Sequence, residues 1–352
     1  MIRENSRFKI VRTKGYNYNF DKKTGYFERW GKTVDDDPDY SPIGPEIVDL
    51  ECTTICNGPA SESGGGPCKF CYKSNTKNGV NMSFETFKTV FHNLPRTITQ
   101  IAFGVDANLT SNPDIWKMFD YCRANDYNKV VPNVTVANIT TETANRLVAV
   151  TGAVAVSRYV NKDWCYDSVE RLVSAGLKQC NIHCMIAEEN YDAAVETIRD
   201  YHVDPRLKGM NAIVFLSLKQ TGRGVKFTPL AFDRFKSLID LCLELDVKFG
   251  FDSCGAQKFI QAVEGHENYE AFKVCAEPCE STCFSLYVNV EGKYFPCSFS
   301  EGHGEWVDGI DLTKVNDFNS DVWYNERTLK FRDNLISGRD GKNCRSCPLF
   351  EI

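Results

Sequence analysis

Three cysteines within one short segment are the residues of this sequence best suited to chemistry. Cys56, Cys68 and Cys71 lie in LECTTICNGPASESGGGPCKFCYKSN, where the last two form a Cys-x-x-Cys pair. That spacing lets two thiolates face one metal centre from a tight turn. Three thiolates on one loop indicate a four-iron, four-sulfur (4Fe–4S) cluster in which one iron has no protein ligand and is open to a small molecule.

Cys52 offers a second interpretation of the same segment. It stands four positions before Cys56, so the four thiolates together could form a zinc ribbon. A zinc ribbon is a small self-contained fold, whereas this loop interrupts an array of alternating strands and helices, which favours the cluster. Cys52 itself falls in the expected strand 46–52, and we predict that it is a core residue or lies behind the ligands.

The segment resembles the fingerprint of the radical S-adenosylmethionine (SAM) superfamily. That fingerprint is Cys-x3-Cys-x2-Cys after the first strand of a barrel, often with Asn after the first cysteine and an aromatic residue on either side of the third. This chain has Cys56-Asn57 and then Cys68-Lys69-Phe70-Cys71-Tyr72. It departs from the pattern because eleven residues, rather than three, separate the first two cysteines, and PASESGGG is interpreted as a flexible insertion.

The resemblance implies that Cys56, Cys68 and Cys71 hold a 4Fe–4S cluster whose open iron binds SAM. Phe70 and Tyr72 are expected beside this cofactor. An electron donor such as flavodoxin or ferredoxin would supply the electron that cleaves SAM to a 5′-deoxyadenosyl radical. The radical would abstract hydrogen from a peptide or protein side chain, or from a small metabolite, and lead to oxidation, crosslinking or epimerisation.

Further SAM contacts follow from the same resemblance. The second strand of the family usually ends in Gly-Gly-Glu-Pro, and Gly104-Val105-Asp106 takes that place here. Gly104 and Asp106 are therefore expected at the SAM amino group. Ser157 and Arg158 end a later strand and are expected at the ribose and carboxylate, which a planar guanidinium suits.

A second group of cysteines lies near the C-terminus: Cys275, Cys279, Cys283, Cys297, Cys344 and Cys347. Cys283-x8-Gly292-x4-Cys297 resembles the start of SPASM or shorter twitch domains, which hold auxiliary Fe–S clusters. Six cysteines are fewer than a two-cluster SPASM domain uses, so one auxiliary 4Fe–4S cluster is implied. Its expected ligands are Cys279 or Cys283, with Cys297, Cys344 and Cys347. A structural zinc site is the alternative.

Alternating strand and helix patterns across residues 46–255 must position the first cysteine loop. The strands are apolar runs, typical of strands buried on both faces, and the connections between them are long enough for parallel pairing. A TIM-like partial barrel and a doubly wound sheet both fit this pattern. The resemblance implies an α/β fold with a partial (β/α)6 TIM-like barrel. In a barrel and in a doubly wound sheet alike, the cysteine loop would follow the first strand at the ligand-binding end.

Three segments are predicted along the chain. Residues 1–45 form an N-terminal extension with a β-hairpin in YNYNFDKKTGYFERW, and residues 46–255 form the barrel. Residues 256–352 form a small cysteine-rich α+β auxiliary domain. The remaining cysteines noted in apolar periodic segments, Cys122, Cys180, Cys184 and Cys242, are predicted to be buried.

Composition limits the function classes. A net charge of -6 argues against general nucleic-acid binding, and no apolar run is long enough for a membrane span. No secretory signal is visible, so a cytoplasmic protein is expected, and sixteen cysteines then favour metal binding or burial over disulfides. The alternatives to a radical SAM enzyme of peptides or metabolites are a zinc-stabilised binding or regulatory protein, and a relative that acts on a nucleoside or sugar.

Overall fold

The computed structural model describes residues 1–352 except 60–66, 159–160, 339–344, 346 and 350–352. Four short strands form an antiparallel sheet at the N-terminus, in the order β1-β2-β3-β4. They are β1 (Ile2–Glu4), β2 (Phe8–Arg12), β3 (Asn17–Asp21) and β4 (Phe27–Trp30). The predicted hairpin is confirmed as β3 and β4, and Gly25 takes the positive φ that its turn requires. β1 and β2 were not predicted, because three to five mixed polar residues carry little signal.

Ten strands form the main sheet, in the order β11-β10-β9-β8-β7-β6-β5-β12-β13-β14. They are β5 (Ile47–Glu51), β6 (Gln100–Gly104), β7 (Val131–Val136), β8 (Ala153–Ser157), β9 (Gln179–Ile186), β10 (Ala212–Ser217), β11 (Phe249–Phe251), β12 (Ser285–Val288), β13 (Lys293–Phe295) and β14 (Ile310–Asp311). All pairings from β5 to β11 are parallel and follow chain order. The predicted mixed α/β fold with a large parallel sheet is therefore confirmed.

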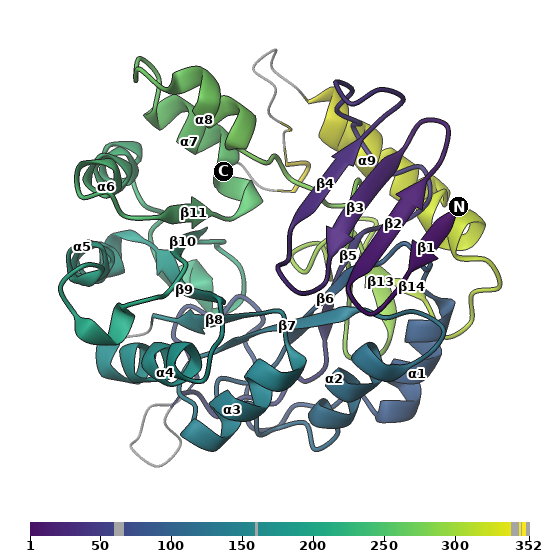
Figure 1. The fold of residues 1–352 in the computed structure, drawn as a ribbon, viewed down its shortest axis with the longest axis horizontal. Helices are drawn as coiled ribbons and strands as arrows, with labels where there is room; N and C mark the ends of the chain where they lie inside the picture. Colours follow the sequence, from purple (N-terminus) through teal and green to yellow (C-terminus); the bar gives the residue numbers. More distant parts are fainter. Residues whose placement is uncertain (60–66, 159–160, 339–344, 346, 350–352) are drawn as a thin grey trace.

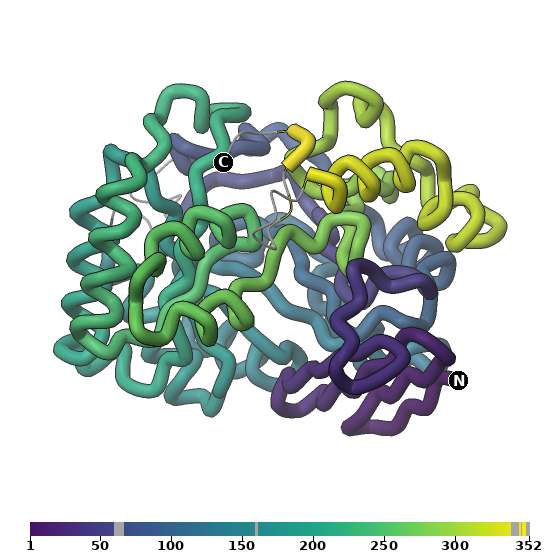
Figure 2. The backbone as a smooth tube through the Cα atoms, turned by 90° about the horizontal axis from the view of Figure 1, so that it is seen from above, coloured from purple at the N-terminus to yellow at the C-terminus, as the bar shows by residue number. Residues whose placement is uncertain are grey.

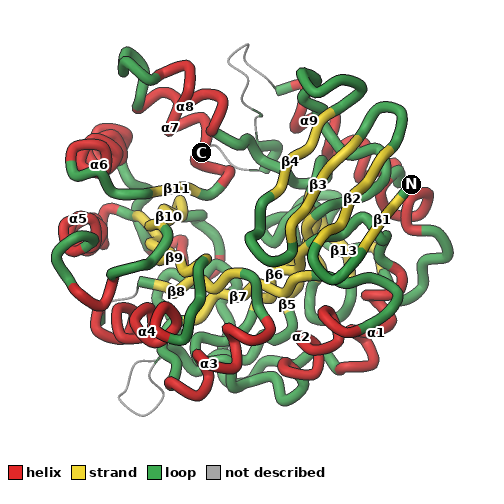
Figure 3. The backbone as a smooth tube through the Cα atoms, viewed as in Figure 1, coloured by secondary structure: helices red, strands yellow, loops and turns green. Residues whose placement is uncertain are grey.

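One helix follows each of the strands β5 to β10. These helices are α1 (Phe84–Asn93), α2 (Ile115–Ala124), α3 (Thr141–Val150), α4 (Lys162–Ser174), α5 (Tyr191–Asp200) and α6 (Phe232–Glu244). Figures 1 and 3 show the sheet as an arc with these helices along its outer side, unlike a doubly wound sheet, which has helices on both faces. The core lies between them, where Phe103 packs edge-on against Phe119 at 4.9 Å and against Phe87 at 6.0 Å.

The strands alternate, contrary to the expectation of fully apolar strands. In β9, Cys180, Ile182, Cys184 and Ile186 are buried toward the helices, while Asn181 and His183 face the inner side of the sheet. The same period of two places Ala153, Ala155 and Ser157 of β8 on the inner side of the sheet. The reason is that the inner side borders a cavity instead of a second layer of helices.

The C-terminal segment joins the main sheet instead of standing apart from it. β12 pairs in parallel with β5, so Ser285 lies opposite Ile47 and Val288 opposite Leu50. Three more helices follow β11 along the chain: α7 (Ala256–Ala262), α8 (Tyr269–Cys275) and α9 (Glu326–Ser337). Figure 2 shows the N-terminal sheet and α9 on the opposite side of the molecule from α4 to α6.

The N-terminal sheet contacts the beginnings of the central strands. The Tyr16 hydroxyl donates to the Glu46 carboxylate, just before β5, and the Tyr18 hydroxyl donates to the Thr97 carbonyl, before β6. Buried Lys9 donates to the Arg96 carbonyl at 3.3 Å. These contacts place the N-terminal sheet at the amino ends of β5 and β6, opposite the end from which the cysteine loop leaves.

Candidate metal and cofactor site

The loop between β5 and α1 is closed at its base by backbone pairing. The Thr54 amide donates to the Val80 carbonyl at 2.9 Å, and the Cys56 amide donates to the Thr76 carbonyl at 2.9 Å. Gly79 is required here, because a Cβ would collide with the Thr54 backbone. Cys56 is thereby fixed just beyond the carboxyl end of β5.

A tight turn holds the other two cysteines. The Cys71 amide donates to the Cys68 carbonyl at 3.2 Å. Arg223, in the segment after β10, donates from Nε to the Cys68 carbonyl at 2.9 Å and from its own amide to the Cys71 carbonyl at 3.0 Å. Gly222 beside it has φ of 55° and touches the Tyr72 carbonyl so closely that a side chain would collide. Arg223 therefore holds this turn in place.

The three cysteines face one cavity of ≈ 520 Å³ at the carboxyl ends of the parallel strands. Cys56, Cys68 and Cys71 are each half-buried, and the cavity runs from their loop down the inner side of β5 to β10. A space of this size suits a small organic ligand. Thiol donors from one loop, open on one side to such a space, fit a 4Fe–4S cluster together with a molecule bound beside it.

Cys52 does not belong to this group. It is completely buried, and its thiol donates to the Gly104 carbonyl at 3.2 Å. Burial raises the pKa of this thiol well above its ordinary value. The prediction that Cys52 is a core residue is confirmed, which removes the fourth thiolate that a zinc ribbon would need.

Three of the predicted SAM contacts line the cavity. Tyr72, Gly104 and Ser157 all border it. The Tyr72 ring packs against Phe299 with 4.5 Å between ring centroids, which fixes its orientation. The Gly104 carbonyl already accepts the Cys52 amide at 3.0 Å, so Gly104 contributes backbone shape to the cavity.

The other three predicted contacts point elsewhere. Asp106 is buried and accepts the amides of Thr110 and Ser111, both at 2.9 Å, so its carboxylate holds its own loop. Arg158 is buried behind β8, where its guanidinium donates to Glu196 of α5 at 2.8 Å. Phe70 packs edge-on against Phe227 at 6.0 Å. None of the three lines the cavity as the family pattern would require, because each side chain is engaged by its own neighbours.

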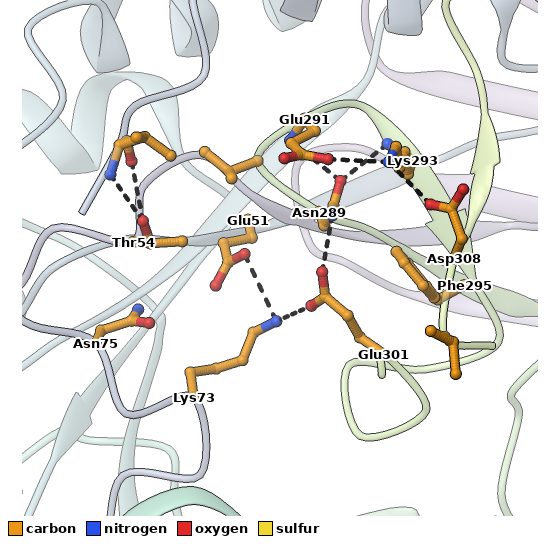
Figure 4. Close-up of a pocket in the computed structure, with 13 residues that line it drawn as sticks. Glu51, Thr54, Lys73, Asn75, Asn289, Glu291, Lys293, Phe295, Glu301 and Asp308 are labelled. Carbon is orange, nitrogen blue, oxygen red and sulfur yellow. Dashed lines mark hydrogen bonds and ion pairs between the residues drawn. The ribbon is translucent and has the colours of Figure 1, made fainter. Parts of the chain in front are cut away.

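One side of the cavity is built from a charged network. The Tyr287 hydroxyl donates to Glu51 at 2.9 Å, and the Lys73 ammonium lies 3.6 Å from the same carboxylate. Lys73 also contacts Glu301, which accepts from Asn289 at 2.7 Å. Figure 4 shows this network around Lys73, where it borders a neighbouring pocket of ≈ 400 Å³. Burial raises the pKa of Glu51, while Lys73 and Tyr287 oppose that rise.

His183 faces the cavity from β9. Its Nδ1 is 3.5 Å from the Thr135 hydroxyl on β7. Burial lowers the pKa of His183 to about 4, so the ring is neutral at physiological pH. The ring therefore forms part of the cavity wall.

The second cysteine group gathers around a separate cavity of ≈ 270 Å³. Cys254, Cys279, Cys297 and Cys347 line it. Cys283 does not: it is completely buried in a cluster with Tyr16, Tyr18 and Leu335. Of the two alternatives from sequence, Cys279 lines this cavity and Cys283 does not. Cys344 lies outside the described residues.

Cys254 was missed by sequence reasoning. It follows β11 in a 3₁₀ turn, Ser253–Gly255, at the same end of the sheet as the first cysteine loop. Its position directly after an expected strand was a signal that could have identified it. Lys219 is buried, pairs with Asp252 at 3.1 Å and also interacts with this thiol.

Three absences hold for the described part of the chain. No disulfide joins any of its cysteines. No three of its His, Cys, Asp or Glu side chains are grouped closely enough to hold a single metal ion. A 4Fe–4S cluster spaces its thiolates more widely, because each binds a different iron. None of the helices is long and apolar enough to cross a lipid bilayer, within those same residues.

The fold is similar to that of Streptococcus suis SuiB, whose crystal structure was determined bound to S-adenosylmethionine. The TM-score is 0.61 at 11% identity, over 94% of this chain and 90% of SuiB. HydG, a maturase of the [FeFe]-hydrogenase, gives a TM-score of 0.43 at 14% identity over 60% of this chain and 52% of HydG, which is too low to support an argument. No protein-family model and no curated protein sequence matches the chain. The likeness to SuiB establishes the fold.

Proposed function

We propose that this chain is a radical SAM enzyme that binds a 4Fe–4S cluster through Cys56, Cys68 and Cys71. One observation carries the proposal: these three thiols face a single cavity at the carboxyl ends of parallel strands, in a fold like that of SAM-bound SuiB. A cluster held by these three thiolates would provide the one electron needed for reductive cleavage of the C–S bond of SAM to methionine and a 5′-deoxyadenosyl radical. The curved, open sheet supports description of the core as a partial (β/α)6 barrel.

The residues of the chain supply positioning and enclosure. Arg223 and Gly222 hold the cysteine turn, and Tyr72 and Ser157 border the space that SAM would occupy. The neutral His183 ring offers a hydrogen bond without adding charge. The walls of the cavity keep bulk water away from a reactive radical.

A second 4Fe–4S cluster completes the proposal. Its ligands are Cys279, Cys297 and Cys347, which share one cavity, with Cys344 as predicted from sequence. This assignment makes the C-terminal segment a twitch-like auxiliary domain that shares its sheet with the core through β12. Flavodoxin or ferredoxin would supply electrons, and the substrate would be a peptide or protein side chain or a small metabolite.

Iron content tests the metal assignment. The protein is purified without oxygen, reconstituted with iron and sulfide, and its iron counted per chain. About eight irons are expected for the wild type and about four for the Cys56/Cys68/Cys71→Ala variant. Cys242→Ala, which removes a buried thiol outside both cavities, is the matched control and should retain about eight. Tightly bound zinc without iron would contradict the proposal and favour a zinc-stabilised binding protein.

A further inference from the structure

One carboxylate in the main cavity stands without a partner. Asp49 lies on β5, two residues before Glu51 and on the same side of the sheet. It lies deep in the fold, but its side chain is exposed to the cavity. Within the described residues, no side chain or backbone group donates a hydrogen bond to this carboxylate or pairs with it.

Nearby cations are already engaged by other carboxylates. Lys73 contacts Glu51 and Glu301, and Lys219 pairs with Asp252 at 3.1 Å. The Asp49 side chain is exposed to the cavity and has no partner among the described residues, so its carboxylate is available to a ligand that enters there. Glu51, with Tyr287 and Lys73 bound to it, shows how the same strand satisfies a carboxylate that has a structural role.

Asp49 stands between the two cysteine groups. It lines the cavity of Cys56, Cys68 and Cys71, and it also lines the smaller cavity of Cys279 and Cys297. Among the residues that the structure describes, Ser298 is the other one that borders both cavities. A ligand held by Asp49 would therefore lie within reach of both sites.

The charges that surround Asp49 favour a cationic ligand. The main cavity is lined by the carboxylates of Asp49 and Glu51 and by one ammonium, that of Lys73. The smaller cavity adds Asp252 and Glu280 and, among the described residues, one ammonium, that of Lys219. Acidic groups outnumber basic ones among the described residues that line each cavity, so a protonated amine gains Coulomb energy that an alcohol does not. Burial and nearby Glu280 raise the pKa of Asp49 to about 6, which leaves it mainly ionised at neutral pH.

We propose that Asp49 binds a protonated amine of the substrate and so orients the substrate between the two cysteine groups. The amine site rests on the proposed function and adds a substrate class to it: a small amine, or a peptide that presents a lysine or N-terminal ammonium. Asp49 lies deeper than the cysteine loop, on the strand itself, which assigns it to the substrate and not to SAM.

Simple probes test the amine site. Binding of n-butylammonium to the reconstituted protein with SAM is measured anaerobically by saturation-transfer NMR, with n-butanol and butyrate as neutral and anionic probes of matched length. Butylammonium should bind, and butanol and butyrate should bind at least about tenfold more weakly, a difference of about 1.4 kcal/mol. Asp49→Asn should lose that preference, while Asp120→Asn, an exposed aspartate on α2, should keep it.

Two outcomes would overturn the amine site: equal binding of butylammonium by Asp49→Asn, or equal binding of butanol by the wild type. A thermal melt gives an independent check without ligand. Asp49→Asn should raise Tm, because it removes a carboxylate that faces other acidic groups without a cationic partner, and a lowered Tm would show that Asp49 has a structural partner. Cleavage of SAM by the wild type is measured separately, so amine binding without SAM cleavage would contradict the proposed function and leave the amine site standing.

Discussion

The two cysteine groups differ in how the chain assembles them. Cys56, Cys68 and Cys71 come from one loop, whose base and turn are fixed by backbone hydrogen bonds and by Arg223. The thiols of the second cavity come from segments after β11, after α8, after β13 and near the C-terminus. Residue spacing indicates all three cysteines of the first loop, whereas for the second cavity it left Cys279 and Cys283 as alternatives and did not indicate Cys254.

The largest effect that would sharpen this comparison is expected from Gly222→Val. The new side chain would collide with the Tyr72 carbonyl, and φ of 55° suits glycine only, so the contact between the two loops must open. Iron should fall by about four per chain, from the first site alone. Gly15→Val, at a position with open space, is the control. Full iron content in Gly222→Val would show that the first loop does not depend on this contact.

The second cavity is tested by comparing Cys279→Ala with Cys283→Ala. Cys279→Ala should lose the auxiliary iron, about four per chain, while Cys283→Ala should keep it. Cys283 is packed among Tyr16, Tyr18 and Leu335, so its truncation should instead lower the free energy of unfolding by about 1 kcal/mol. Iron analysis and denaturant unfolding separate the two effects. Loss of iron from Cys283→Ala would reverse the ligand assignment.

Asp49→Asn should change the pH dependence of stability. The pKa of Asp49 in the fold is about 6, above the value of about 3.9 in an unfolded chain. A raised carboxyl pKa means that the folded state binds the proton more tightly, so wild-type stability falls as pH rises from about 4 to about 6. The stability gain of Asp49→Asn should be near zero at pH 4 and about 1 kcal/mol at pH 7, after discounting for solvent in the cavity.

That gain is measured by urea unfolding at each pH, with Asp120→Asn as the control. Other charged groups face Asp49: Glu280, whose charge raises its pKa, and Glu51, Lys73, Lys219 and Asp252, which line the same cavities. These groups are present in both the wild type and the variant, so their own titrations largely cancel in the difference in stability. A gain that does not vary with pH would contradict the unpaired state of Asp49.

The smallest effect is expected from Asp106→Asn. The carboxylate accepts amides of its own loop and does not line the cavity, so SAM affinity should change by less than about threefold, or ~0.7 kcal/mol. Equilibrium binding of SAM to the reconstituted protein gives this value. A tenfold loss would restore the family-based expectation that this position binds the SAM amino group.

Sequence spacing was sufficient for the central strands, their helices and the first cysteine loop. It failed where a side chain's direction depends on tertiary packing. Asp106 and Arg158 stand at the strand ends that the family pattern indicates, but Asp106 caps its own loop and Arg158 pairs with Glu196. A strand end fixes the position of a residue and leaves open which neighbour its side chain binds.

Other misses have the same cause. Cys254 and Asp49 were not identified as cavity residues from sequence, because the fold brings distant segments of the chain to one cavity. Cys283 matched a domain pattern by spacing, but the N-terminal sheet packs over it and encloses it among aromatic rings. The pairing of β12 with β5 could not be read from sequence either, because almost the whole core lies between the two strands.

Formation of 5′-deoxyadenosine tests the central claim most directly. The reconstituted protein is reduced with dithionite under anaerobic conditions, SAM is added, and the products are separated by chromatography. Wild-type protein should form 5′-deoxyadenosine, and the Cys56/Cys68/Cys71→Ala variant, checked for an unchanged circular dichroism spectrum, should form none. Equal formation by the variant, or none by wild-type protein that carries its iron, would contradict a SAM-cleaving site at these three cysteines.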